Sequence, residues 1–593
     1  MVLLVVAGFV LGALHSPLPR VPDQAALVVA PTGTLVEQLS GDPLSRAVAQ
    51  ARGAGHAETL LWDLTDAIRA GAKDARIRVL VLNFDQLDGV AGQPTMAELA
   101  AAIRDFKVSG KKVIAYGQAY QRDGYYLASL ADEIYVDPTG YVLLEGYSRY
   151  RLYYKDVLDK FNVDINIFRV GKYKSAVEDY TRSEMSPEDR EESQAYLSAL
   201  WLGYQRSVDG DRKLPAGSVA NYISALPQAA ATKQSGAQIA LKAHLVTAAK
   251  SPMDVEHRIA EITGADENGS FHQVSAEDYA RVVHSDNALG RHDQTRIAVI
   301  VAEGEILDGN QSPGTIGGES TSRLLREARD DNKIKAVVLR VDSPGGSVTA
   351  SEQIYREVQA VRAAGKPVVV SMANYAASGG YYISAPADEI WANPATITGS
   401  IGIFAEVPTI NRTLAKFGVG VDGLRTTPLD GMMQRVEVPL TDAARTVIQA
   451  NVDDGYRQFV DRVSSSRRKT PDQVDEIGQG RVWAGVDAQS RGLVDHLGSF
   501  GQAVQAAAKR AHLRDYKLQF LEPEMSWAQS LALSIKVRAV RLLTSTGLAD
   551  LTGTPLGGFA QLAEATPLAR EVQRLSRFDR PNHLYAYCFC TAQ

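Results

Sequence analysis

Ser378 lies in a stretch whose residue types could support nucleophilic catalysis. The apolar residues 368–370 (VVV) predict a short buried strand, and small residues follow them up to Ser378 and the pair Gly379-Gly380. A serine at a strand-to-helix turn presents its hydroxyl, and neighbouring glycines let a substrate backbone approach free N–H groups. The competing interpretation is a glycine-rich turn that serves packing alone.

A serine nucleophile needs a base within hydrogen-bond reach. None of the ten histidines is singled out by a glycine-rich turn or by an acidic partner, although a Ser–His–Asp arrangement stays open. The alternative base is a lysine, because residues 167–178 (IFRVGKYKSAVE) predict a strand that ends near Gly171 and then presents Lys172 and Lys174. A lysine acts as a base only where burial lowers its pKa toward neutrality. Two solvated surface lysines are the competing interpretation.

Length and composition restrict the class of protein. A chain of 593 residues is too long for one core, so we expect two or more domains. A formal net charge of -6 is small for this size and predicts no nucleic-acid partner. The only cysteines, Cys588 and Cys590, are separated by one residue, which predicts neither a disulfide nor a closed zinc site. We expect no metal and no nucleotide cofactor.

The first 22 residues suggest membrane targeting. Residues 2–14 (VLLVVAGFVLGAL) form an uncharged apolar run, and a proline-containing stretch follows it up to Pro22. The run is shorter than the ~20 residues that cross a bilayer, and no basic region precedes it. We expect residues 1–22 to be a membrane anchor or a signal segment, complete or truncated. The alternative is a buried N-terminal strand.

The two halves of the chain repeat one pattern. Residues 74–85 (DARIRVLVLNFD) and 332–342 (NKIKAVVLRVD) both predict a strand. Each is followed by an amphipathic helix, a glycine (Gly110 or Gly365) and a further strand, at an offset of 255 to 256 residues. A register held through strand, helix and strand predicts a duplicated α/β domain.

The differences between the copies concern the candidate site. Residues 122–124 (RDG) take the place of 378–380 (SGG), and 85–89 (DQLDG) the place of 342–346 (DSPGG). The first copy therefore has the scaffold without the candidate nucleophile. We expect one copy to have kept a site that the other has lost.

Four motifs in this order resemble the long, duplicated form of signal peptide peptidase A (protease IV): residues 170–178 (VGKYKSAVE), 340–347 (RVDSPGGS), 376–382 (AASGGYY) and 397–402 (ITGSIG). The similarity covers roughly residues 25–520. It implies an α/β fold, a tandem duplication of a Clp-protease/crotonase-like domain. It also implies a serine endopeptidase that degrades cleaved signal peptides. The enzyme would be a homotetramer, anchored by its N-terminus in the bacterial inner membrane with its catalytic part in the periplasm.

The resemblance also implies roles for single residues. Ser378 would be the nucleophile and Lys174 the general base, so that the two repeats each contribute one half of a Ser/Lys dyad. The backbone N–H groups of Gly345 and Gly379 would form the oxyanion hole. Supporting roles fall to Gly346 and to Ser400, which would orient the lysine amine. The counterpart of Lys174 in the second repeat falls near Asp430, where no lysine occurs.

The expected domains follow from these patterns. They are residues 1–22; an N-terminal repeat with the base, 23–265; a polar linker, 266–294; a C-terminal repeat with the nucleophile, 295–520; and an extension, 521–593, with an amphipathic helix at 527–543. Capping signals at residues 186–189 (SPED), 441–442 and 470–473 (TPDQ) predict three helix starts.

Two other functions stay open. A crotonase-like acyl-CoA hydratase or isomerase would share the oxyanion turn, but Ser378 and Lys174 would then have no task. A membrane-tethered scaffold would need both repeats to be inactive, which the intact motifs around Ser378 and Lys174 disfavour.

Overall fold

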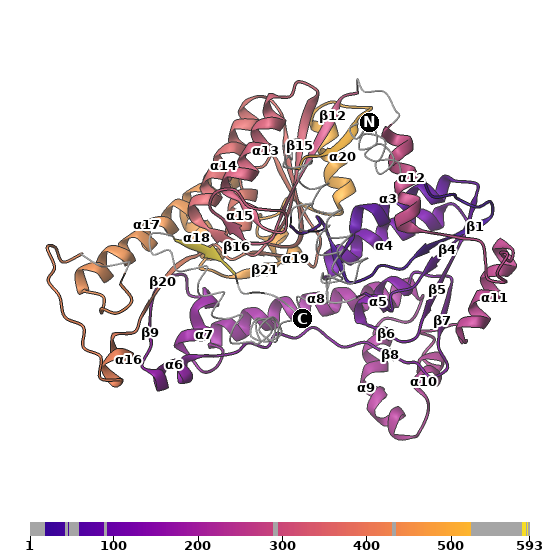
Figure 1. Ribbon diagram of the computed structural model, residues 1–593, viewed down its shortest axis with the longest axis horizontal. Helices are drawn as coiled ribbons and strands as arrows, with labels where there is room; N and C mark the ends of the chain where they lie inside the picture. Colours follow the sequence, from indigo (N-terminus) through magenta and orange to yellow (C-terminus); the bar gives the residue numbers. More distant parts are fainter. Residues whose placement is uncertain are drawn as a thin grey trace, which may run out of the picture. The chain divides into compact units, whose positions relative to one another are not determined.

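The computed structural model describes residues 18–41, 46, 58–87, 92–288, 294–429, 435–522, 584–588 and 590. The apolar run at 2–14 and the expected helix at 527–543 lie outside these residues. Within them, no helix is both long and apolar enough to cross a bilayer. The chain divides into two compact units that alternate along the sequence (Figure 1). Unit 1 takes residues up to 37, 57–146 and 204–292, and unit 2 takes 38–56, 147–203 and 293–593.

Unit 1 is built on a parallel sheet. Its strands, in spatial order, are β10 (Ala248–Ala249), β7 (Glu133–Val136), β5 (Lys112–Gly117), β4 (Ile77–Leu82), β1 (Ala25–Val29) and β11 (Gln273–Ser275). Helices α3 (Leu61–Lys73) and α4 (Gln93–Val108) pack together, and α11 (Pro252–Thr263) packs on β4 through Val255 and Ile259. The central strands are apolar on both sides because helices cover both faces.

The expected linker over residues 266–294 is wrong. Its described part contains β11 and helix α12 (Ala276–Ala288), and both belong to unit 1. The segment is mostly polar, but its apolar side chains Phe271, Val274, Ala276, Tyr279 and Ala280 are buried. Sparse apolar residues at the right positions are enough to dock a strand and a helix on an existing core.

Unit 2 contains the second copy of this sheet. Its strands, in spatial order, are β21 (Val482–Ala484), β19 (Ile397–Gly399), β17 (Val368–Ala377), β15 (Ile334–Ser343), β12 (Arg296–Glu303) and β23 (Lys517–Phe520). Strand β18 (Glu389–Ala392) also pairs with β17, and β22 (His496–Leu497) pairs with β18. Helices α13 (Gly318–Asp330) and α14 (Val348–Ala363) pack side by side, and α20 (Phe500–Arg510) packs against β15 and β17 (Figure 1).

The strand order confirms the duplication. The series β10-β7-β5-β4-β1-β11 of unit 1 corresponds to β22-β18-β17-β15-β12-β23 of unit 2, strand for strand. The repeat that the sequence offset of 255 to 256 residues predicts is therefore a repeat of topology as well.

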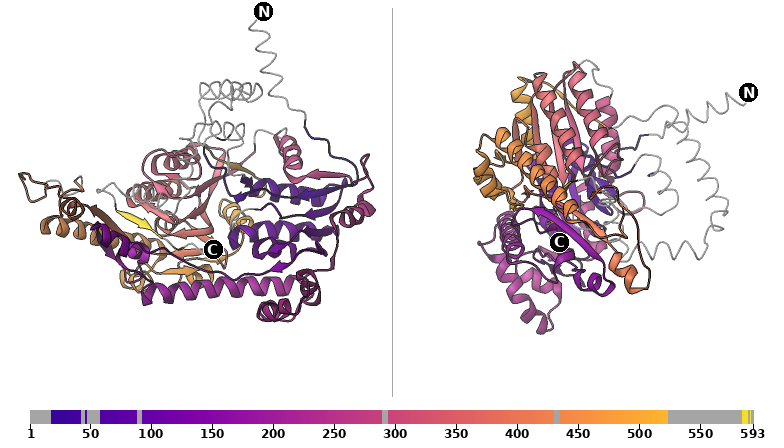
Figure 2. Two further views of the ribbon diagram at one scale, coloured as in Figure 1. Left: turned by 60° about the horizontal axis from the view of Figure 1, so that its bottom comes forward. Right: turned by 90° about the vertical axis from the view of Figure 1, so that its left-hand side faces the viewer.

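Unit 2 also has a second sheet, which belongs to the site. In order, its strands are β14 (Ile316–Gly317), β13 (Ile306–Leu307), β16 (Gly345–Ser347), β24 (Tyr585–Tyr587), β20 (Ile403–Thr409) and β9 (Asp164–Val170). Strands β9 and β20 pair antiparallel over their whole lengths, from Asp164 opposite Thr409 to Val170 opposite Ile403 (Figure 2). The expected boundary at 265 is therefore not a boundary between compact units, because this pairing places residues 147–203 in unit 2.

The end of the chain contributes more than expected. Of the extension at 521–593, the structure describes 521–522, 584–588 and 590, and three of these residues form β24 in the second sheet. The prediction of no disulfide is wrong, since Cys588 and Cys590 are joined. Their Cα atoms are 5.3 Å apart, a separation that a disulfide spans, so one intervening residue does not prevent the bond.

The capping signals predict the helix starts correctly. Helices α8 (Pro187–Asp211), α17 (Asp442–Arg467) and α18 (Pro471–Ile477) begin one residue after Ser186, Thr441 and Thr470. Each of these hydroxyl oxygens accepts a hydrogen bond from a backbone N–H in the first turn of its helix, at 3.0 to 3.2 Å. Helix α8 matters for the site because its first turns run beside the candidate base.

Candidate active site

Ser378 occupies the turn that the sequence predicts. It follows β17 directly and precedes the short helix α15 (Gly379–Ser384), and its side chain is buried. Its φ angle is +56°, a left-handed conformation that is unfavourable for a residue with a side chain. Such strain concentrates at functional sites, where the surrounding structure maintains it. Here Ser378 N–H donates to the carbonyl of Gly399 at 2.8 Å and so fixes the turn.

Lys174 reaches Ser378 through the pairing of β9 with β20. Strand β9 ends at Val170 opposite Ile403, so the segment that follows β9 lies beside the segment that precedes β20. The first of these segments carries Lys174 and the second carries Ser400. Strand β19, which ends at Gly399, runs parallel to β17 and ends beside Ala377. The pairing of β9 with β20 and of β19 with β17 therefore brings Lys174, Ser400 and Ser378 together.

The geometry of the three side chains is that of a dyad with a supporting hydroxyl. The Lys174 amine donates to Ser378 Oγ at 2.8 Å, to Ser400 Oγ at 3.1 Å and to the Ser400 carbonyl at 3.3 Å. All three residues are at most 1% exposed. Among the residues that the structure describes, the other hydrogen bond of Ser378 Oγ goes to the Gly402 carbonyl, and no histidine contacts it.

Burial shifts the pKa of the Lys174 amine toward neutral pH, where the amine can act as a base. It lowers the pKa of Lys174 to about 7, while the nearby Glu192 carboxyl acts in the opposite direction. Burial also raises the pKa of Glu192 to about 8, although its carboxylate accepts a hydrogen bond from Val482 N–H at 3.1 Å. Both groups move toward their neutral forms for the same reason, the cost of holding a charge away from water. Near pH 7 a large fraction of Lys174 is therefore an unprotonated amine.

A glycine allows the lysine to sit this deep. Gly480 has a φ of +77° and packs against the backbone of Lys174. A Cβ atom at position 480 would lie 2.6 Å from Lys174 N and 2.7 Å from Lys174 Cβ, which is closer than real atoms approach. Position 480 must therefore lack a side chain if Lys174 is to keep its place.

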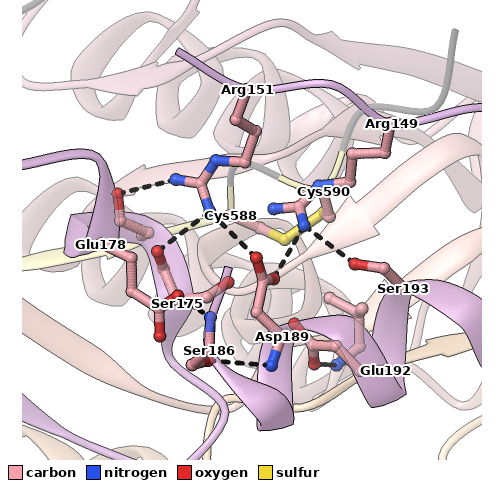
Figure 3. A network of polar contacts seen from close by, with 12 residues as sticks. Arg149, Arg151, Ser175, Glu178, Ser186, Asp189, Glu192, Ser193, Cys588 and Cys590 are labelled. Carbon is pink, nitrogen blue, oxygen red and sulfur yellow. Dashed lines mark hydrogen bonds and ion pairs between the residues drawn. A yellow bond between two sulfur atoms is a disulfide. The ribbon is translucent and has the colours of Figure 1, made fainter. Parts of the chain in front are cut away.

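A buried network of charged side chains lies beside the turn that carries Lys174, and Figure 3 shows two guanidinium groups directed at one carboxylate. That carboxylate, Asp189 of α8, is fully buried. Its Oδ1 lies 2.7 Å from Arg149 Nη1, and its Oδ2 lies 3.5 Å from Arg151 Nη1. Arg149 also donates to Ser193 Oγ at 2.8 Å. The paired charges and hydrogen bonds offset the large cost of burying each ion.

The network also holds the backbone on either side of the base. Arg151 donates to the carbonyl of Ser175 at 3.1 Å and pairs with Asp179 at 2.6 Å. Arg169 donates to the carbonyl of Lys174 itself at 3.0 Å. Because these carbonyls belong to the base and its neighbour, the network fixes the direction in which the lysine side chain leaves the backbone.

The glycine turn at 345–346 lies next to the nucleophile, but the two glycines differ. The N–H of Gly345 donates to Ser343 Oγ at 3.1 Å. Gly346 instead lies opposite Ala586 in the ladder between β16 and β24. The flanking bonds, from Val348 N–H to the Leu584 carbonyl and from Cys588 N–H to the Pro344 carbonyl, make Gly346 and Ala586 a hydrogen-bonded pair, so the Gly346 N–H is directed at β24. The structure thus favours Gly346 over the expected Gly345 as the partner of Gly379 in an oxyanion hole.

The first copy has no counterpart of this site in the described residues. Arg122 stands at the start of helix α5 (Arg122–Ala128) of unit 1, in the place that Ser378 has in unit 2. Its guanidinium donates to Asp123 at 2.8 Å and to the Gly146 carbonyl at 3.3 Å. A buried arginine therefore stands where unit 2 has Ser378.

Sequence reasoning missed Glu192, Asp189 and the two arginines of the network. The capping signal placed Asp189 in the first turn of α8, but nothing in a polar helical segment marks which acidic side chains are buried. Apart from the expected helix at 527–543, sequence reasoning also assigned no role to the end of the chain. An apolar pair such as Tyr585-Ala586 between two strands of the site could have been noticed as a short strand.

Comparison with known proteins identifies peptidases as relatives of this chain. The model of peptidase family S49 matches residues 105–265 and 360–514, and the Clp protease model matches residues 294–390. Protease 4 of Salmonella typhi is 38% identical over 577 residues, which cover 96% of this chain and 91% of that protein. This chain belongs to peptidase family S49.

Other relatives of this S49 chain point the same way. Protease 4 of Haemophilus influenzae is 37% identical and covers 89% of this chain and 84% of its own length. A protein of Enterococcus faecium named as a signal peptide peptidase is 35% identical over 191 residues, 32% of this chain and 55% of that protein. The chain is therefore a serine peptidase with two Clp-like repeats, and the resemblance in its four motifs is confirmed.

Proposed function

We propose that this S49 peptidase is a serine endopeptidase that uses Ser378 as nucleophile and Lys174 as general base to degrade signal peptides after their release. The observation that carries the proposal is the 2.8 Å contact between the Lys174 amine and Ser378 Oγ, with both side chains buried. A buried amine with a pKa of about 7 can take a proton at neutral pH, which an ordinary lysine cannot.

The proposed reaction is acyl transfer in two steps. Neutral Lys174 takes the hydroxyl proton as Ser378 Oγ attacks the peptide carbonyl, and then gives that proton to the leaving amine. Water next attacks the acyl-enzyme, with Lys174 again as the base. Ser400 Oγ, 3.1 Å from the amine, orients it between these transfers.

The charge that develops on the carbonyl oxygen needs preorganised donors. Gly346 and Gly379 supply them in this proposal, because the N–H of Gly345 already donates to Ser343 Oγ. Strand β16 pairs with β13 on one side and with β24 on the other, so a peptide substrate would pair with β16 in the place that β24 occupies.

The substrate class and setting extend the proposal. Signal peptides are apolar and extended once unfolded, which suits pairing along a strand edge. The apolar run at residues 2–14 supports an anchor in the bacterial inner membrane, with the catalytic part in the periplasm. We also propose a homotetramer, as the resemblance implies, and hydrolysis without a cofactor.

The test uses the full chain and a synthetic signal peptide. Ser378→Ala should abolish hydrolysis, whereas Ser384→Ala should retain it, since that buried hydroxyl of α15 only donates to the Gly380 carbonyl at 2.7 Å. Loss in the first variant alone, with both folded by circular dichroism, supports the proposal. Hydrolysis by a folded Ser378→Ala protein would refute it.

A further inference from the structure

Ser343, the last residue of β15, contacts the glycine turn through its side chain. It is fully buried and stands two residues before Gly345. Its hydroxyl donates to the Gly304 carbonyl at 2.7 Å and accepts from the Gly345 N–H at 3.1 Å. A serine hydroxyl has one proton to donate, and the Gly304 carbonyl takes it, so toward Gly345 the oxygen acts as an acceptor. The hydroxyl therefore links the glycine turn to the segment between β12 and β13.

The glycine turn needs such a link to keep its N–H groups in place. Gly345 has a φ of +104°, and glycine leaves such a conformation at little cost because it has no Cβ. The pairing with β13 reaches Gly346 but not Gly345. The pairing with β24 cannot hold the turn during catalysis, because a peptide substrate would take the place of β24. The bond to Ser343 remains on the side away from the substrate.

The backbone of Ser343 is itself fixed against the elements that carry the nucleophile. Ser343 lies opposite Ala376 in the pairing of β15 with β17, and Ala376 stands two residues before Ser378. A Cβ atom at Gly380, in the first turn of α15, would lie 2.6 Å from the Ser343 carbonyl oxygen, so α15 packs directly on this residue. The Ser343 hydroxyl thus joins the glycine turn to a backbone that is held in place beside the nucleophile.

The first copy of the sheet keeps one residue of this region and lacks the other. Asp342 and its counterpart Asp85 each accept a backbone N–H at 2.9 Å from the neighbouring strand, β17 or β5, or from the residue after it. The next position differs, since unit 2 has Ser343 where unit 1 has Gln86. Unit 1 reaches the same strand order without this serine and without a nucleophile. The aspartate therefore serves the fold, whereas the serine accompanies the site.

We propose that Ser343 is a positioning residue for the oxyanion hole. Its hydroxyl holds the N–H of Gly345 and so directs the N–H of Gly346, together with that of Gly379, at the carbonyl oxygen of the substrate. The inference rests on the proposed function of the Ser/Lys dyad. Ser343 does not touch the substrate, and charge on the carbonyl oxygen develops only in the transition state, so loss of the hydroxyl should slow the reaction and leave binding unchanged.

The test compares two serine substitutions in the full-length protein, with kcat and KM measured on a chromogenic peptide anilide. Ser343→Ala should lower kcat at least about tenfold and change KM less than about twofold, because one oxyanion donor contributes about 10²–10³-fold to kcat. Ser129→Ala is the matched control and should keep both values. Ser129 of unit 1 is equally buried, and its hydroxyl donates to the Tyr126 carbonyl at the same 2.7 Å.

Two further measurements distinguish a misdirected donor from general damage to the site. A peptide boronate forms a tetrahedral, negatively charged adduct with the nucleophile, so its affinity for Ser343→Ala should fall by about the factor lost from kcat/KM. The acylation rate should still rise through a pKa of about 7, since Lys174 is unchanged.

A second variant keeps the inference testable if Ser343→Ala does not fold. Ser343→Cys replaces the oxygen by sulfur, a weaker acceptor at the same place. It should lower kcat at least about threefold, again with KM nearly unchanged.

An unmodified kcat in a folded Ser343→Ala or Ser343→Cys protein would overturn the inference, as would an equal loss in Ser129→Ala. A loss that lies entirely in KM would also overturn it, because Ser343 would then serve substrate binding. In these cases the unmodified chain still hydrolyses the anilide and Ser378→Ala does not, so the proposed function stands. If the unmodified chain is inactive, or Ser378→Ala is active, the proposed function itself fails.

Discussion

At the scale of single residues, the site depends on removing water from one amine. Lys174 is 1% exposed, and burial lowers its pKa to about 7 against the opposing effect of the Glu192 carboxyl. The sequence could identify Lys174 and Ser378 because both lie in short motifs with glycines and small residues around them. It could not identify Glu192, since burial of a carboxyl on a polar helix is decided by what packs against it.

The close approach of Gly480 to Lys174 gives a prediction at this scale. Gly480→Ala should lower kcat/KM at least about tenfold, because the added methyl must displace the base and a 1 Å misplacement is costly. Gly418→Ala is the matched control, since Gly418 has the same φ of +77° with nothing within 4 Å of an added Cβ. Both variants carry similar backbone strain, so equal loss of activity in a peptide-hydrolysis assay would contradict the steric argument.

At the scale of elements, the pairing of β9 with β20 assembles the site. The strand that ends near Gly171 is predicted from its own apolar pattern, whereas the sequence analysis predicts no strand over β20. Their pairing was not readable, because the partners lie about 240 residues apart and no local signal encodes an antiparallel register, such as Val170 opposite Ile403. The pairing is also what determines the extent of unit 2.

The network around Asp189 gives the prediction for this scale. Asp189→Asn leaves Arg149 and Arg151 without their shared carboxylate, and breaking such a buried pair costs about 3–5 kcal/mol. We expect a lower melting temperature and a lower kcat with little change in KM, because the turn that carries Lys174 loosens. Glu188→Gln, one position earlier on α8 and partly exposed, should change neither quantity. An unchanged kcat in a destabilised Asp189→Asn protein would show that the network does not position the base.

At the scale of the whole molecule, the two copies of the sheet differ in whether they carry the candidate site. The constant offset between the repeats predicts their common strand order. Arg122 stands where the second repeat has Ser378, and this difference predicts that the first copy lacks a nucleophile. The boundary between the units could not be predicted in the same way. Residues 147–203 precede the second repeat in sequence but pack with it, since compactness follows contacts and not chain order.

Both halves of the dyad lie in unit 2 of one chain, and this gives the third prediction. Co-expressed Ser378→Ala and Lys174→Ala chains should have no more peptidase activity than the two variants alone, because neither chain has both residues. The measurement is hydrolysis of a signal peptide by the purified mixture, with unmodified chains as reference. Recovery of a substantial fraction of the reference activity would mean that the dyad forms between neighbouring chains.

The central claim is that buried Lys174 is the base for Ser378, and the most direct test is the pH dependence of acylation. The pre-steady-state rate with a chromogenic peptide anilide should be measured from about pH 5 to pH 9. The active form is the neutral amine, so the rate should be low in acid and rise through a pKa of about 7. Lys174→Met should show no acylation over this range. A rate independent of pH, or acylation of the Lys174→Met protein at the unmodified rate, would contradict the account.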